Sequence, residues 1–124
     1  MPKAIKSDKA PAAVGPYSHG CETGGLIFTS GQLPIDAATG EMPGDAAGQA
    51  KQSLENVRHT LEAAGSSMAK VVKTTVFLKD IADFGAVNEV YASFFAEPYP
   101  ARSCFEVARL PKDALVEIEV VAEK

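Results

Sequence analysis

The sequence of 124 residues has few cysteines, no long apolar run and no excess of basic side chains. Its only cysteines, Cys21 and Cys104, are too few for a disulfide scaffold, so we expect free thiols in a reducing compartment. No segment approaches the ~20 consecutive apolar residues of a membrane-spanning helix. The N-terminus, Met1–Lys6, lacks the apolar core of a signal peptide. These absences predict a cytoplasmic protein.

The charge balance excludes further classes. Twelve basic and sixteen acidic side chains give a net charge of −4, so the chain has no basic footprint for nucleic acid or for a membrane surface. No dinucleotide fingerprint is present, and no His, Cys and carboxylate residues follow metal-ligand spacing. The segment Gly15–Gly20 is no phosphate loop, because it lacks a lysine and a following helix.

What is present is an ordinary globular composition, with 46% hydrophobic and 23% charged residues. The length predicts a single domain over residues 1–124. Hydrophobic periodicity predicts two helices among about six strands, and therefore an α+β fold with both helices packed on one face of the sheet. The strands placed by this pattern are Tyr17–Glu22, Leu26–Ser30, Val71–Lys79, Arg102–Leu110 and Leu115–Ala122.

Capping signals delimit the two helices. The first is expected to begin after an Asp45 cap and to end at Gly65. The second is expected after an Asp83 cap and before Pro98. Its inward-facing residues by helical spacing are Phe84, Val87, Tyr91 and Phe95.

The last two strands are expected to pair as a hairpin with Val107 opposite Ile118, because a one-residue slip would expose one apolar set. This register places Phe105 beneath the helices and puts Arg102 and Glu117 on the opposite face. The two charged residues would be roughly 20 Å apart along the strands. If both serve one site, they come from different subunits. The apolar residues left uncovered on that face, Ala108, Leu115 and Val121, also predict an interface.

Arg102 and Glu117 are the main candidates for chemistry. Arg102 is either a surface arginine or a bidentate clamp for a substrate carboxylate. Glu117 either pairs with a cation or has a raised pKa that suits it to proton transfer. For Glu119 we expect an ion pair between subunits, with Arg109 or a lysine.

Other candidates carry weaker signals. Cys104 could be a nucleophile, but no histidine can be placed beside it, so a pocket-lining thiol is the better interpretation. Asn88 either bridges backbone groups in the core or reaches a pocket. Tyr17, Ser30 and Gly31 lie near turns, where side chains and backbone amides can face a ligand.

These residues belong to motifs spread over nearly the whole chain. The motifs are Ala10–Ser18, Thr29–Pro34, Thr39–Glu41, Gln52–Val57, Val72–Phe77, Pro100–Cys104 and Val116–Glu119. Together they resemble the Rid (YjgF) family, most closely its reactive intermediate deaminase A branch.

The resemblance implies a chorismate-mutase-like fold and a homotrimer with sites between subunits. It implies hydrolysis of 2-iminobutanoate and 2-iminopropanoate to 2-keto acids and ammonia, without a metal or organic cofactor. By position, the catalytic residues would be Arg102, Glu117 and Tyr17. Arg102 would hold the substrate carboxylate, and Glu117 would orient or deprotonate the attacking water. The pocket would be lined by Tyr17, Ser30, Gly31, Asn88 and Cys104.

Two departures and two alternatives accompany this resemblance. The connection Ala96–Pro100 is shorter than in several members, and Phe105 replaces a more usual aliphatic residue, which its parity assigns to the core. A sensor that binds 2-keto acids without turnover would use the same Arg102 pocket. A ribonuclease activity, attached to some relatives, is disfavoured by the net charge of −4.

Overall fold

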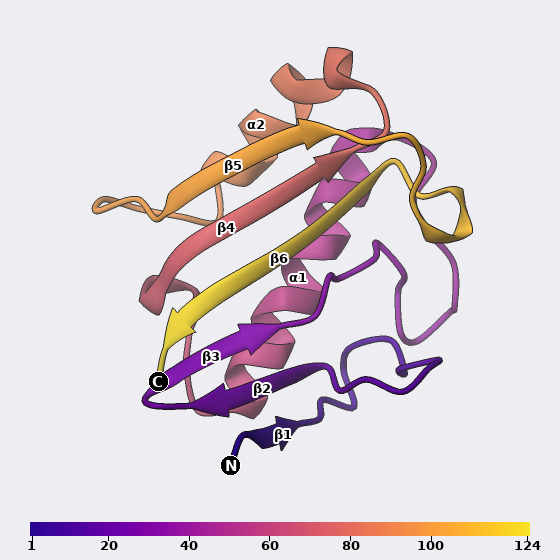
Figure 1. Cartoon of the computed structure of the whole chain (residues 1–124). Helices are drawn as coiled ribbons and strands as arrows, with labels where there is room; N and C mark the ends of the chain where they lie inside the picture. The colour runs from indigo at the N-terminus through magenta and orange to yellow at the C-terminus, as the bar shows by residue number, and fades with distance from the viewer.

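The computed structural model describes residues 1–124 as one six-stranded sheet with two helices. The strands are β1 (Lys3–Ile5), β2 (Gly20–Thr23), β3 (Leu26–Thr29), β4 (Val71–Leu78), β5 (Ala101–Glu106) and β6 (Val116–Glu123). The helices are α1 (Ala46–Ala63) and α2 (Phe84–Ala92), and the strand order is β1-β2-β3-β6-β4-β5 (Figure 1).

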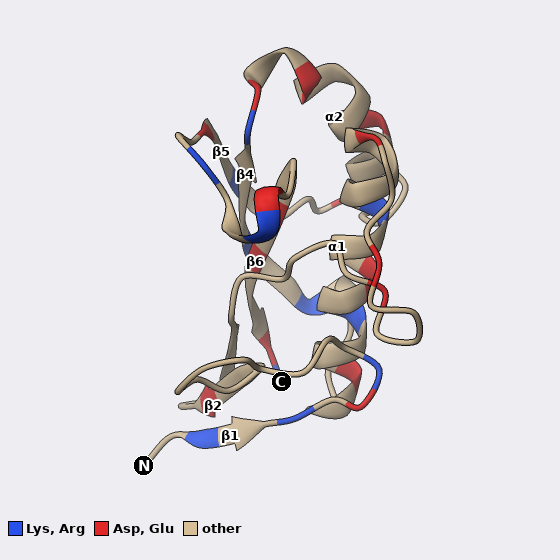
Figure 2. Cartoon of the chain, turned by 90° about the vertical axis from the view of Figure 1, so that its right-hand side faces the viewer, with Lys and Arg blue, Asp and Glu red and all other residues tan.

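Both helices lie on the same side of the sheet (Figure 2). The predicted α+β fold with helices on one face is therefore confirmed. The buried core lies between the two layers and is built from alternate residues of the central strands and one stripe of α1, including Leu54, Val57, Leu61, Val76, Leu78, Val116, Ile118 and Val120. The other side of the sheet carries no element of this chain and is called here the open face.

The first three strands form an antiparallel meander. The turn between β2 and β3 consists of Gly24 and Gly25, with φ of 58° and 78°. Two successive positive φ values define a tight hairpin turn whose twist matches that of the strands, and glycine adopts them without strain. The first predicted strand was placed too early, because β2 begins at Gly20 and Tyr17 lies in the preceding loop.

Helix α1 follows its sequence signals. The Asp45 side chain accepts a hydrogen bond from the Gly48 backbone amide at 2.9 Å and so satisfies a free N–H group of the first turn. The chain leaves the helix at Gly65, whose φ of 80° suits glycine. Helix α2 begins directly after Asp83, as predicted, but the Asp83 side chain makes no capping hydrogen bond. A 3₁₀ turn over Ile81–Asp83 precedes the helix, and Asp80 caps that turn by accepting from the Ala82 amide.

The predicted hairpin between the last two strands is also wrong, because β4 lies between β5 and β6. Strand β5 runs parallel to β4 after the α2 crossover, and β6 is antiparallel to both β3 and β4. The two eight-residue strands β4 and β6 therefore pair at the centre, where each has a neighbour on both sides. Periodicity reports which face a residue occupies, but it does not report which strand lies beside it.

Because β5 pairs with β4 and not with β6, the side chains of β5 that face the helices differ from those predicted. Arg102 and Cys104 face α2, and Phe105 is 49% exposed on the open face, where its ring lies 6.3 Å from that of Phe77. The expectation that Phe105 is a core residue is wrong. Leu115 packs against the core and not on the open face.

Some of the expected face assignments hold. In β6, Val116, Ile118 and Val120 are buried beneath the helices, as predicted, and Glu117 and Glu119 alternate with them on the other side. Neither helix is long and apolar enough to cross a membrane.

Candidate functional site

Arg102 is held by side chains of α2. The parallel register opposes Arg102 to Thr74 of β4, and Thr74 is fully buried beneath the helices. The guanidinium carbon lies 4.7 Å from the centre of the Tyr91 ring and 5.3 Å from that of Phe84. Its Nη1 donates to Asn88 Oδ1 at 2.6 Å. The three α2 residues follow helical spacing, so one stripe of the helix receives one guanidinium.

This arrangement leaves Arg102 able to bind an anion. A guanidinium has five N–H donors, and Asn88 uses one of them. The side chain is exposed, and the two ion pairs of the chain join Arg109 to Asp113 and Lys124 to Glu22. A charged, ordered fork without a carboxylate partner suits the bidentate capture of a ligand carboxylate. The Asn88 side chain bonds to Arg102 and not to backbone groups of the core, and its role beside a pocket stays a prediction.

Cys104 lies two residues further along the same face of β5. It is half-buried against the core, and burial raises the pKa of its thiol while the nearby Arg102 charge opposes the shift. No base activates it. His19 Nδ1 accepts from the Ser7 amide at 3.0 Å, and His59 contacts the Lys9 carbonyl. The geometry is that of a half-buried, neutral thiol near Arg102 without a base to activate it.

Glu117 lies on the open face, in a row with two aromatic side chains. The register of β5, β4 and β6 opposes Phe77 to Phe105 on one side and to Glu117 on the other. Burial is the main cause that raises the pKa of the Glu117 carboxyl, and the negative charge of Glu119 raises it further. A carboxylate that binds a proton more readily is a suitable general base.

Gly31 lies directly against this carboxylate. A Cβ built on Gly31 would lie 2.8 Å from Glu117 Cδ, closer than real Cβ contacts come. A side chain at position 31 would therefore displace the carboxylate, so glycine permits the position that Glu117 occupies here. The neighbouring residue Gln32 is joined to Ile118 by backbone hydrogen bonds in both directions, which fixes this approach.

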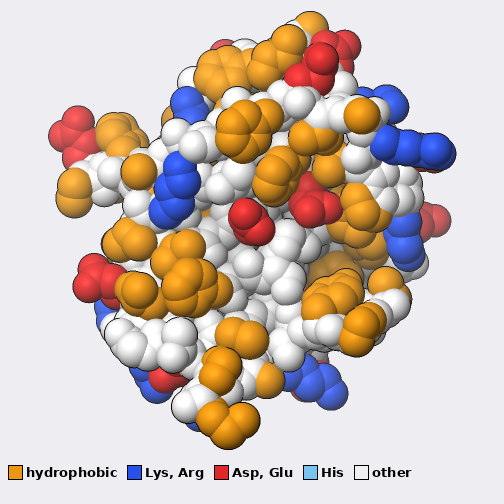
Figure 3. All heavy atoms as spheres, in the orientation of Figure 1, with side chains coloured by type: hydrophobic (Ala, Val, Ile, Leu, Met, Phe, Trp, Pro, Cys, Tyr) orange, Lys and Arg blue, Asp and Glu red, His pale blue; other side chains and the backbone are white.

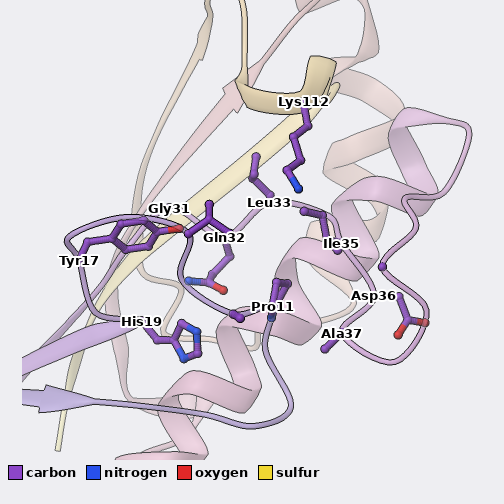
Figure 4. Close-up of a pocket in the computed structure, with 13 residues that line it drawn as sticks. Pro11, Tyr17, His19, Gly31, Gln32, Leu33, Ile35, Asp36, Ala37 and Lys112 are labelled. Carbon is purple, nitrogen blue, oxygen red and sulfur yellow. The ribbon is translucent and has the colours of Figure 1, made fainter.

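Ser30 and Tyr17 complete this second group. Ser30 Oγ donates to the Ser18 carbonyl at 2.6 Å and so ties the Tyr17 loop to the end of β3. Tyr17 is 51% exposed and lines, with Gly31, a cavity of about 250 Å³. Figure 4 shows Tyr17 and His19 entering this cavity from one side and Lys112 from another.

The candidate residues thus form two groups that a single chain does not join. Arg102, Asn88 and Cys104 lie on the helix side of the sheet; Glu117 and Gly31 lie on the open side. The predicted separation of roughly 20 Å assumed that β5 pairs with β6, which is wrong. Arg102 and Glu117 nevertheless lie on opposite faces of the sheet, so one chain cannot bring them into one site.

The open face has the character of an interface. Figure 3 shows acidic side chains near its centre with hydrophobic side chains around them. Phe28 and Phe105 are 42% and 49% exposed there. Exposure of large aromatic side chains to water is unfavourable, and several of them on one face are typical of a surface that another molecule covers. Glu119 has no cation partner within the chain, and Lys73 of the adjacent strand donates to Ser103 Oγ at 2.7 Å.

Sequence reasoning missed the partners that hold Arg102. Phe84 and Tyr91 were both expected to face inward. Tyr91 is in the core and also contacts the guanidinium, whereas Phe84 is 37% exposed and contacts the guanidinium from outside the core. Thr74, which bonds Tyr91, was not singled out. The available signal was the polar Asn88 within an aromatic stripe of the same helix. It also missed His19, Gln32 and Lys112 as cavity-lining residues, for which the sequence carries no signal.

Comparison with known proteins extends these observations to a family. The sequence model of the family described as endoribonuclease L-PSP matches residues 7–124. The chain is 54% identical to the 2-iminobutanoate/2-iminopropanoate deaminase of Escherichia coli K12 over 98% of each chain.

Solved structures are similar over the same length. The crystal structure of E. coli TdcF with bound serine superposes with a TM-score of 0.94 at 50% identity, covering 98% of both chains. RidA from the Antarctic bacterium Psychrobacter sp. PAMC 21119 superposes with a TM-score of 0.95 at 45% identity, covering 98% of this chain and 99% of that one.

Proposed function

This chain belongs to the Rid (YjgF) family, whose endoribonuclease L-PSP model it matches, and from that premise we propose that it hydrolyses 2-iminobutanoate and 2-iminopropanoate. The products are the corresponding 2-keto acids and ammonia. The observation that carries the proposal is Arg102, an exposed guanidinium ordered by α2 and lacking a carboxylate partner within the chain. A relative with 54% identity over nearly its whole length is named for this activity.

The proposed chemistry divides between the two groups of residues. Arg102 binds the substrate carboxylate and so orients the C=N carbon. Glu117 accepts a proton from water as the water oxygen bonds to that carbon, and the C=N π electrons move to nitrogen. Glu117 then returns its proton to the amino group. The C–N bond breaks as the hydroxyl oxygen forms the C=O double bond and gives its proton back to Glu117 or to water, which releases ammonia and leaves the keto acid. The raised pKa of Glu117 supports its assignment as the base.

The remaining candidates shape the pocket. Asn88 orients Arg102, and Cys104 contributes a small neutral wall beside it. Tyr17, Ser30 and Gly31 form the side of the pocket next to Glu117, where Gly31 leaves space for the carboxylate. No step requires a metal ion or an organic cofactor, because a protonated imine is already electrophilic.

We further propose that the active form is a homotrimer in which Arg102 of one subunit meets Glu117 of the next. The placement of these residues on opposite faces supports this, as does the exposure of Phe28 and Phe105 on the open face. A closed ring with three identical contacts covers this face in every copy. We propose that residues 1–124 act as one domain in the cytoplasm without a nucleic-acid partner, in keeping with two unpaired cysteines.

The activity is tested by generating 2-iminobutanoate with a pyridoxal-phosphate-dependent threonine dehydratase and following its decay with and without this protein. We expect faster decay and faster formation of 2-ketobutanoate. If the protein binds 2-ketobutanoate in a calorimeter but leaves imine decay unchanged, it is a sensor and the deaminase proposal is wrong.

The shared site is tested by mixing two inactive variants. Arg102→Ala and Glu117→Gln are each expected to form trimers without an intact site. Random exchange of subunits at equal amounts should restore roughly a quarter of the wild-type activity, because each mixed ring contains one intact pairing. Light scattering gives the assembly state in parallel. A mixture that stays inactive despite proven subunit exchange, or a stable monomer, would overturn the shared site.

A further inference from the structure

Beneath Arg102 lies a buried polar contact that the proposed reaction does not use directly. The Tyr91 hydroxyl and Thr74 Oγ1 form a hydrogen bond of 2.8 Å. Tyr91 is 7% exposed and Thr74 is fully buried, so neither hydroxyl has water as an alternative partner. The bond joins α2 to the central strand β4 directly under the guanidinium.

The contact fixes the aromatic surface on which Arg102 lies. The Tyr91 ring packs on Phe95 with ring centres 4.6 Å apart, and the Arg102 guanidinium carbon lies 4.7 Å from the centre of the Tyr91 ring. A ring held at its hydroxyl cannot slide along the strand. Thr74 and Arg102 are paired neighbours on β4 and β5, so the residue that holds the ring also sets the backbone position of the arginine.

The protonation state of Tyr91 is compatible with this role. Burial is the main influence and raises the pKa of the Tyr91 hydroxyl, while the hydrogen bond with Thr74 and the Arg102 charge lower it by less. The phenol is therefore neutral at physiological pH. A neutral ring attracts the cation through its face without forming an ion pair that would compete with a ligand carboxylate.

We propose that Tyr91 and Thr74 are positioning residues that hold Arg102 in the orientation that captures the substrate carboxylate. They touch neither substrate nor water, and they act through the guanidinium alone. The inference deepens the proposed function and rests on it for its kinetic consequence. Its structural consequence, an ordered Arg102 side chain, is independent of any reaction.

The kinetic test uses Tyr91→Phe, Thr74→Val and the double variant. Each single change removes one hydroxyl and keeps the shape of the side chain. We expect KM for 2-iminobutanoate to rise about threefold to tenfold while kcat changes by less than about twofold, because a weakened carboxylate clamp is lost binding in both ground and transition states.

The double variant separates positioning from mere stability. Each single variant leaves one buried hydroxyl without a partner and should lose stability, whereas the double variant leaves none and should recover much of it. If the bond matters only for folding, KM should recover together with stability. The inference requires KM to stay raised in the double variant. Thr60→Val is the matched control, because it removes a buried threonine hydroxyl from α1, where it bonds the Asn56 carbonyl, far from the β5 edge.

A spectroscopic test does not depend on turnover. In ¹⁵N-labelled protein, the Arg102 Nε–H resonance, identified by its absence in Arg102→Lys, should show the restricted motion of an ordered side chain. Tyr91→Leu should release it fully, and Tyr91→Phe and Thr74→Val should release it in part. Unchanged relaxation in all three variants would overturn the inference. If the wild-type protein proves inactive but these changes occur, the deaminase proposal fails and the positioning role stands.

Discussion

The two halves of the candidate site treat their charged side chains differently: the surroundings of Arg102 keep its cation accessible, whereas those of Glu117 disfavour its negative charge. Around Arg102, one helix supplies two aromatic faces and an amide oxygen, so the cation is ordered and remains accessible. Around Glu117, aromatic neighbours and a second carboxylate make the charged form less favourable, and no cation of the chain compensates. The first half is complete within one chain. The second half lacks a cation for the Glu117 carboxylate, and in the proposed trimer a neighbouring subunit would supply it.

Glu117→Gln should have the largest effect, since it keeps the shape and removes the base. We expect kcat for imine hydrolysis to fall about 10²- to 10⁴-fold, the usual contribution of a positioned general base. The affinity for 2-ketobutanoate, measured by calorimetry, should change little because Arg102 is intact. A variant that keeps more than a tenth of the wild-type kcat would exclude Glu117 as the base.

Arg102→Ala tests the other half. We expect kcat/KM to fall by about 100-fold or more, as for loss of a bidentate charge-assisted contact, and 2-ketobutanoate binding to disappear. Arg109→Ala is the matched control, because Arg109 is an exposed arginine paired only with Asp113, and it should remain within twofold of the wild type by the usual behaviour of surface pairs. Equal losses in both variants would mean that Arg102 acts only through net charge.

Gly31→Ala sharpens the comparison by disturbing the Glu117 side alone. The added methyl group would displace the Glu117 carboxylate, so we expect roughly tenfold lower kcat. The loss of stability should be at the low end of overpacking, about 1 kcal/mol, because the carboxylate ends a flexible side chain. Gly44→Ala is the control, since a Cβ there meets no atom within 4 Å. Steady-state kinetics of both variants measure the difference, and an unchanged kcat in Gly31→Ala would contradict the close approach.

The pH dependence of stability should differ between the wild type and Glu117→Gln. The folded state raises the pKa of Glu117 above its ordinary value of 4.5, so folding favours the protonated form. This contribution is fully present below the ordinary value and is lost as pH rises through the folded value. Glu117→Gln should therefore unfold at higher denaturant concentration than the wild type at pH 7, and the gap should close below pH 4.5. A constant gap across this range would show that Glu117 titrates normally.

Cys104→Ser should have the smallest effect. Burial raises the pKa of the thiol and no base lies beside it, so we expect Cys104 to line the site and not to act as a nucleophile. We expect kcat/KM to stay within about threefold of the wild type, since Ser preserves the shape but is more polar. Cys21→Ser, on the far strand β2, is the control. Complete loss of activity in Cys104→Ser alone would return Cys104 to the role of nucleophile.

Local signals predicted most of the elements but not their neighbours. The sequence predicted the Asp45 cap, the apolar stripe of α1 and the Gly24–Gly25 turn, because each depends on residues close together in the chain. The pairing of β5 with β4 depends on the α2 crossover and on β6 entering the sheet between β3 and β4. A face assignment made from the wrong neighbour then misplaced Phe105 and gave Arg102 the wrong side of the sheet.

The sequence by itself determined the family, the α+β class and the residues from which a site can be built, because these follow from short motifs and from periodicity. Only the tertiary structure decided that the Arg102 side chain packs against α2, while Glu117 lies against Gly31 on the opposite face of the sheet. The physical reason is that strand order is chosen by the burial of whole strands far apart in the chain. No segment of the sequence contains that choice alone.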